Sequence, residues 1–180
     1  MIAQMELQLI KMATSHYFTK SSKGRQISFR GRTLFDRFER VDQTLSSAVM
    51  NEHFSNKAVI AHDLILEGDF VENIVFDFNG IDTVRFYHRA QLMLREEGFL
   101  NFTAFESATI GHLHVYIHKG HTPLLEGYNI AKTLSTKLSQ KLPLQWRVFP
   151  SPDLPREFNI LALPHKVYAK ERGTNWSKYM

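Results

Sequence analysis

The chain has 180 residues, a formal net charge of +4 at pH 7, nine histidines and no cysteine. This length is enough for one domain with a sizeable core. The absence of cysteine excludes disulfides, thiolate zinc sites and cysteine nucleophiles, and it favours a reducing, cytoplasmic location. Glu6 interrupts the apolar stretch 1–11, and neither a basic start nor a small-residue cleavage site accompanies it, so we expect no signal peptide and no membrane span.

No repeat or linker divides the chain, which predicts a single domain over residues 1–180. Within it we expect an N-terminal helical and basic segment, residues 1–55, packed on a core over residues 56–166. Helical character in the first segment rests on the spacing of Leu45 and Val49.

A cluster of positive charge lies in this N-terminal segment. Seven basic residues stand between positions 20 and 40 against two acidic ones, and apolar residues are interleaved with them. Such a ribbon can follow the phosphate backbone of DNA or RNA, and the residues predicted to do so are Lys23, Arg25, Arg30 and Arg32. A solvated surface segment is the alternative, because the sequence does not show whether the charges share one face.

The core alternates between strand and helix patterns. Strands are predicted over residues 58–65, 73–78, 99–105, 113–118, 144–149 and 159–163. One helix is predicted over residues 83–97 with Gly98 at its end, and a second starts at Thr122-Pro123, with Pro123 in the first helical position. This alternation predicts an α+β or α/β-like fold, in which helices pack on the faces of a sheet.

The first candidate site follows a buried strand, at Asp77-Phe78-Asn79-Gly80. In an extended chain Asp77 and Asn79 point to the same face, so a carboxylate and an amide would stand side by side. These oxygen ligands suit Mg²⁺. The alternative is a turn that starts at Asp77, with Asp82 as the cap of the next helix.

The second candidate is the small-residue turn that contains Ser107, Thr109 and Gly111, followed by His114 in a strand. Free backbone N–H groups in such a turn can hold a phosphate. Because His112, His114 and His118 share strand parity, a zinc site is a competing interpretation, but no third ligand has a diagnostic spacing and zinc is not expected.

Two basic residues at predicted strand ends, Arg147 and Lys166, could also reach an anion. The sequence has none of the short motifs that mark P-loop NTPases, dinucleotide-binding domains, serine hydrolases or zinc proteases.

In order and spacing, these stretches resemble the motif series of the archaeo-eukaryotic primase (primase-polymerase, Prim-pol) superfamily, in a small and divergent bacterial form. Residues 74–80 resemble its first motif, in which hydrophobic residues precede Asp-x-Asp or Asp-x-Glu. Residues 107–117 look like its second motif, a Ser/Gly-rich turn followed by a histidine and a strand. Val148-Phe-Pro and Leu163-Pro resemble the end of the series. The resemblance implies a mixed or antiparallel sheet with an RRM-like catalytic core and a role in DNA replication or repair.

The resemblance also implies roles for the candidate residues. Asp77 would be a catalytic ligand of Mg²⁺ or Mn²⁺ with Asn79 beside it, and His114 would contact the triphosphate of a nucleotide. Ser107, Thr109 and Gly111 would form the turn around the phosphates, with Arg147 and Lys166 as further nucleotide contacts. Two positions depart from the family pattern, because Asn79 and Arg147 stand where it has acidic metal ligands. An arginine there repels a cation but can pair with a phosphate directly.

Three functions therefore follow as hypotheses. The first is a nucleoside triphosphate-binding protein with a degenerate metal site, and the second is an active, metal-dependent primase or polymerase type of nucleotidyltransferase. The third is a non-catalytic protein that binds DNA or RNA. No membrane partner is expected.

Overall fold

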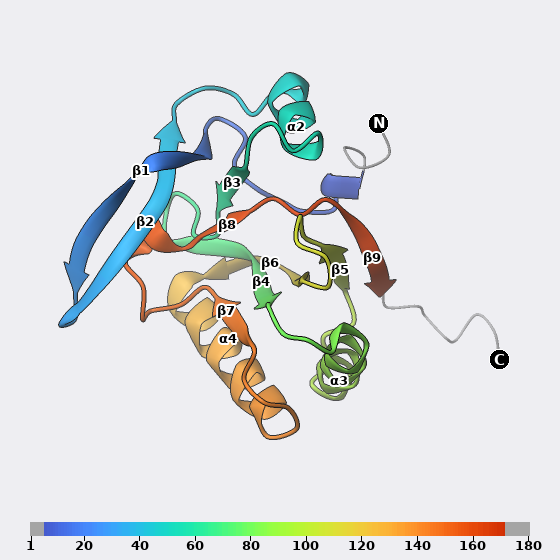
Figure 1. Ribbon diagram of the computed structural model, residues 1–180. Helices are drawn as coiled ribbons and strands as arrows, with labels where there is room; N and C mark the ends of the chain where they lie inside the picture. The colour runs from blue at the N-terminus through green and yellow to red at the C-terminus, as the bar shows by residue number, and fades with distance from the viewer. Residues whose placement is uncertain (1–5, 172–180) are drawn as a thin grey trace.

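Two antiparallel sheets and three α-helices form the part of the chain, residues 6–171, that the computed structural model describes (Figure 1). The larger sheet has the order β7 (Trp146–Phe149), β4 (Phe70–Phe78), β6 (Leu113–Pro123), β5 (Phe102–Glu106) and β9 (Lys166–Glu171). The smaller sheet has the order β2 (Arg32–Val41), β1 (Tyr17–Phe29), β3 (Ile60–Asp63) and β8 (Ile160–Ala162). The predicted α+β class is confirmed.

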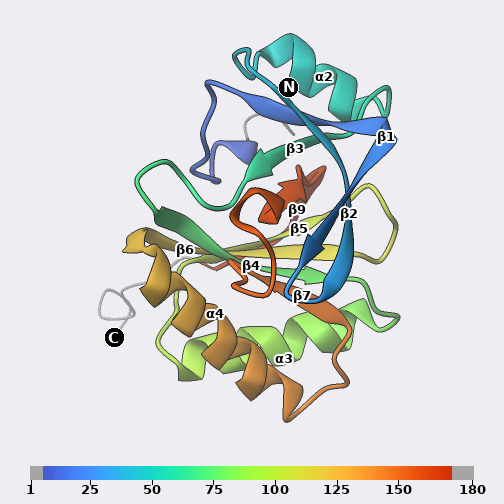
Figure 2. The ribbon, with the colours of Figure 1, turned by 90° about the vertical axis from the view of Figure 1, so that its left-hand side faces the viewer.

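The centre of the larger sheet is a βαββαβ unit. It runs from β4 through α3 (Thr83–Glu96), β5, β6 and α4 (Leu124–Ser139) to β7, which is the split βαβ pattern of ferredoxin-like and RRM-like sheets. Figure 2 shows α3 and α4 together on one side of this sheet. The helical side of β4 carries Ile74, Phe76 and Phe78, which pack in one core cluster with residues of both helices.

The other side of the larger sheet faces the smaller sheet and α2 (Ser47–Phe54) (Figure 2). Because side chains alternate along a strand, Val75 and Asp77 of β4 point to this side. Val75 is buried in a second core cluster with Tyr116 of β6 and Ile60 of β3. The space between the two sheets is therefore apolar at its centre, with Asp77 towards the end of β4.

The helix that the spacing of Leu45 and Val49 indicated is present as α2, whereas the basic part of the N-terminal segment forms strands. Residues 17–41 form a β-hairpin, β1 and β2, and α2 follows it. The hairpin closes through Arg30 and Gly31, which both have positive φ as a type I′ turn requires. Ile27 of β1 lies opposite Leu34 of β2, so the interleaved apolar residues serve cross-strand packing.

The start of α4 and the presence of a ninth strand also differ from the prediction. Thr122 and Pro123 end β6 and pair with residues of β4, so Pro123 is the N-cap of α4 and not its first helical residue. Strand β9, with the sequence KVYAKE, was not predicted; it pairs with β5 at the edge of the larger sheet.

Candidate functional site

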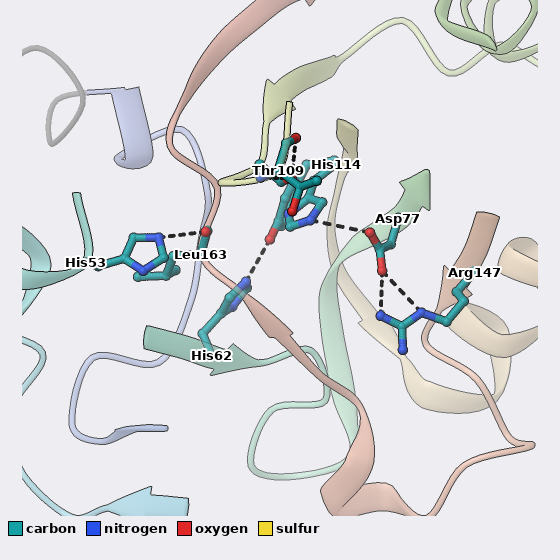
Figure 3. Close-up of polar contacts among 9 residues, drawn as sticks. His53, His62, Asp77, Thr109, His114, Arg147 and Leu163 are labelled. Carbon is teal, nitrogen blue, oxygen red and sulfur yellow. Dashed lines mark hydrogen bonds and ion pairs between the residues drawn. The ribbon is translucent and has the colours of Figure 1, made fainter. Parts of the chain in front are cut away.

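The site is built around Asp77, where three neighbouring strands bring three polar side chains together. In the register of the larger sheet, Asp77 of β4 lies directly opposite His114 of β6 and Arg147 of β7. Arg147 donates from Nη2 to Asp77 Oδ2 over 2.5 Å and from Nε to the same oxygen over 3.2 Å. His114 Nε2 lies 3.4 Å from the other carboxylate oxygen. Figure 3 shows Asp77 between these two basic groups.

Asp77 is charged although it is buried. Its residue is 3% exposed. Burial alone works to raise the pKa of its carboxyl group, but the hydrogen bond and charge of His114, followed by the ion pair with Arg147, outweigh burial and lower the pKa to about 2. The guanidinium of Arg147 also lies over the ring of Phe149, 5.4 Å from its centroid, so it is held from two sides.

The residues around Asp77 do not fit a divalent cation. Both carboxylate oxygens face basic groups, and a cation placed there would lie against the charge of Arg147. Asn79 is exposed beyond the end of β4. Within residues 6–171 no cluster of three or more His, Asp or Glu side chains has the geometry to hold a metal ion. Mg²⁺ or Mn²⁺ at Asp77 remains a prediction from the family resemblance.

The predicted phosphate turn is partly closed on itself. Ser107 Oγ accepts the N–H of Thr109, and the N–H of His112 donates to the carbonyl of Thr109. Gly111 has a φ of 84°, and its carbonyl accepts the hydroxyl of Thr83 over 2.6 Å, which ties the turn to the start of α3.

Other backbone N–H groups of this turn are not used in hydrogen bonds among the described residues. Within the described chain, the N–H groups of Ala108, Ile110 and Gly111 have no hydrogen-bond acceptor. An anion could therefore be bound by this turn, but through a smaller set of backbone groups than the sequence indicated.

A cleft of about 600 Å³ lies above this cluster, between the smaller sheet and the Ser107 turn. Its lining includes Asp77 and Arg147 on the larger sheet, and Lys20 and Arg37 of the hairpin. Lys20 and Arg37 form no ion pair within residues 6–171, and both are exposed. The sequence placed them in the basic cluster but gave no reason to choose them over their neighbours.

The four hairpin residues predicted to bind nucleic acid differ in their surroundings. Arg25 pairs with Asp36 over 3.2 Å and lies over the ring of Phe158. Arg32 donates to the carbonyl of Asp153, whose carboxylate lies 3.6 Å from Arg30. These three arginines contact the protein itself, mainly the loop after β7.

Lys23 is the fourth of these residues, and its side chain is exposed in the first strand of the hairpin. Lys166, which the sequence predicted as a nucleotide contact, pairs with Glu106 over 3.1 Å on the edge strand β9. It does not line the cleft.

Three further histidines near the site have structural roles. His62 of β3 is hydrogen-bonded to the hydroxyl of Tyr116 over 2.8 Å and joins the two sheets (Figure 3). His53 accepts the N–H of Ile60 at Nδ1 and therefore donates from Nε2 to the carbonyl of Leu163. The ring of His165 lies 4.6 Å from that of His53.

Burial keeps the imidazoles of His62 and His53 neutral. Burial and the neighbouring charge of His114 lower the pKa of His62 to about 3. Burial and the charge of His165 lower the pKa of His53 to about 4. Both side chains therefore contribute hydrogen bonds rather than charge to the region between the sheets.

Comparison with known proteins gives similarities at the level of a family model and of a solved structure. A family model described as a domain of unknown function (DUF1882) matches residues 2–73, which include the hairpin and the first part of β4 but end before Asp77. No curated protein matches the chain. The α+β fold is similar to that of the polymerase domain of ligase D from Mycobacterium tuberculosis, solved in complex with DNA, with a TM-score of 0.45 and 13% sequence identity. That similarity covers 79% of this chain and 60% of the polymerase domain chain.

No helix within residues 6–171 is long and apolar enough to cross a membrane.

Proposed function

We propose that the cleft binds the phosphate groups of a nucleoside triphosphate and that it does so without a metal ion at Asp77. One observation carries this proposal: Lys20, Arg37 and Arg147 line the same cleft, and the carboxylate at its base, Asp77, is already neutralised by its own basic neighbours. The cleft thus has unpaired positive charge and attracts an anion.

Arg147 is the residue best suited to hold a phosphate. Asp77 takes up its Nε and one terminal nitrogen, which leaves Nη1 and the outer hydrogens of the fork for a ligand. The side chain of Arg147 is 63% exposed, so a ligand can reach it from the cleft. The guanidinium is thereby fixed in direction before a ligand arrives, which reduces the entropy that binding costs.

His114 has a supporting role in this proposal. Its side chain is 6% exposed, and Nε2 faces Asp77, so the imidazole has little surface to offer a phosphate. Because Asp77 is held by both basic groups, His114 fixes the carboxylate that in turn orients Arg147. We therefore propose His114 as a positioning residue, whereas the family resemblance implied a direct contact with the triphosphate.

The test is a thermal-shift screen of the four NTPs and four dNTPs at millimolar concentration, with EDTA, Mg²⁺ or Mn²⁺. A ligand at 100 times its Kd stabilises the native state by about 2.7 kcal/mol. We expect the melting temperature to rise equally with EDTA and with metal, and Arg147→Met to remove the rise. Arg40→Met is the matched control, because Arg40 is an exposed, ion-paired arginine outside the cleft.

Two results would count against the proposal. If no nucleotide moves the transition of the wild-type protein, the cleft is not a nucleotide site. If the shift requires Mg²⁺ or Mn²⁺, the metal-dependent nucleotidyltransferase of the sequence analysis becomes the better hypothesis, and primer extension by wild type and Asp77→Ala would then test it directly.

A further inference from the structure

A second hollow opens beside the cleft, on the hairpin. It has a volume of about 520 Å³ and is lined by Lys20, Ser21, Ser22, Gly24, Phe35 and Arg37. Lys20, Phe35 and Arg37 line both this side hollow and the cleft. The two spaces therefore meet at two cations and one aromatic ring.

Phe35 is one of the large apolar side chains that stay exposed, and the one that lines both spaces. Its residue is 68% exposed, whereas the cross-strand pair Ile27 and Leu34 on the same hairpin is half-buried. Within the described residues Phe35 belongs to none of the hydrophobic core clusters, and Lys20 and Arg37 line the same hollow. Such rings beside basic side chains are the usual platform on which nucleic acid bases stack.

The side hollow also has polar side chains in its wall, those of Ser21 and Ser22. The pairing of β1 with β2 jumps from Lys20 to Arg25, so the four residues from Ser21 to Gly24 lie outside the regular ladder. Ser22 is exposed in this segment, and the N–H of Lys23 donates to Ser21 Oγ over 3.0 Å. A planar heterocycle needs this combination, an apolar surface for its face and polar groups for its edge.

We propose that the side hollow is the base-binding pocket of the nucleotide site, with Phe35 as the residue on which the base stacks. The inference rests on the proposed function, since the triphosphate would occupy the cleft at Arg147. Lys20 and Arg37 then lie where the sugar and phosphates pass from the hollow to the cleft. Stacking on Phe35 would thus raise the affinity for a nucleotide above that for a polyphosphate without a base.

The experiment compares ATP with inorganic tripolyphosphate, which has the same phosphate chain but no base. Affinities are measured by isothermal titration calorimetry for wild type, Phe35→Leu and Phe35→Trp. We expect Phe35→Leu to weaken ATP about tenfold, within the range of a stacked base, and to leave tripolyphosphate within about twofold. Phe35→Trp keeps the ring and should retain ATP affinity. Phe29→Leu, a matched change on the same hairpin outside both spaces, should leave both ligands unchanged.

The possible results separate this inference from the proposed function. If wild type binds both ligands and Phe35→Leu weakens neither, or weakens both equally, the base does not stack on Phe35, while the phosphate site stands. The same conclusion follows if Phe35→Trp loses ATP as Phe35→Leu does. If wild type binds neither ligand, the phosphate site itself is absent and the base pocket falls with it.

Discussion

At the scale of single residues, the candidate site is organised by one carboxylate, that of Asp77, which lies between two basic side chains. Asp77 is 3% exposed, and His114 beside it is buried as well, with no hydrogen-bond partner for its Nδ1 atom among residues 6–171. Removing the carboxylate charge would leave an imidazole and a guanidinium facing each other without an intervening anion. A buried charged group that loses its partner lowers the free energy of unfolding. Because the side chain of Arg147 is largely exposed, water can solvate its charge, and the decrease is smaller than for a fully buried pair.

We therefore expect Asp77→Asn to lower the free energy of unfolding by about 2 kcal/mol at pH 7, measured by urea denaturation. Asp42→Asn provides the control, because Asp42 forms an exposed pair with Arg40 and its loss should cost less than about 1 kcal/mol. An Asp77→Asn protein as stable as wild type would show that the carboxylate does not hold this cluster together.

The sequence allowed part of this cluster to be predicted. Asp77 and His114 were recognised as candidates from strand parity and family resemblance, and both lie on the same face of neighbouring strands. The ion pair of Asp77 with Arg147 could not be predicted, because it depends on the register between β4 and β7. Lys20 was missed for a related reason: the irregular segment after it breaks the alternation of β1, so counting along the strand does not give its neighbours.

At the scale of elements, the packing of α4 on β4 depends on a glycine. A Cβ atom at Gly127 would lie 2.9 Å from Val71 Cγ2 and 3.3 Å from Pro150 Cγ, and Val71 is fully buried. In an exposed helix, replacing Gly by Ala stabilises by about 1 kcal/mol. Here the added methyl group has no space, and overpacking costs about 1–3 kcal/mol.

We expect Gly127→Ala to destabilise the protein by about 1 kcal/mol in thermal or urea unfolding, since overpacking outweighs the gain in helix propensity. The control is the same change in a Val71→Ala background, where the closest contact atom, Val71 Cγ2, is gone and only the 3.3 Å contact with Pro150 stays, so Gly127→Ala should be close to neutral or stabilising. A stabilising effect in the wild-type background would mean that the helix can move away from the sheet without cost.

Elements with a local signal were predicted well, and elements that depend on distant partners were not. Helix α3 follows from the stripe of Phe86, Ala90 and Met93, which are all buried. The smaller sheet brings β1 beside β3, and β3 beside β8 from the far end of the chain. Such long-range pairing leaves no periodic trace in any one segment, and β9 was missed because its pattern resembles an exposed tail.

At the scale of the whole molecule, the two sheets are joined by histidines that must stay neutral. His62 links β3 to Tyr116 of β6, and His53 links α2 to the segment around Leu163. Both histidine residues are 2% exposed. Their pKa values in the native protein, about 3 for His62 and about 4 for His53, lie below the ordinary value of 6.5 that they regain on unfolding.

The sign of the pH dependence follows from these values. Between pH 6.5 and about 4 the unfolded chain takes up a proton at each histidine, and the native protein does not. The native state is therefore stabilised above pH 6.5 and loses stability as the pH falls below it. Each such proton changes the free energy of unfolding by about 1.4 kcal/mol per pH unit, so the two histidines together contribute a slope of about 3 kcal/mol per unit near pH 5.

We expect urea unfolding at pH 7, 6 and 5 to show this loss, and His62→Gln to reduce its slope by about 1.4 kcal/mol per pH unit whatever it does to stability at pH 7. His53→Gln should reduce the slope by a similar amount, and His88→Gln, a change on the exposed face of α3, serves as the control for the substitution itself. The slope is the decisive quantity, because a lost hydrogen bond shifts stability equally at every pH whereas a lost proton uptake does not. If His62→Gln keeps the wild-type slope, proton uptake by His62 on unfolding does not cause the loss of stability in acid.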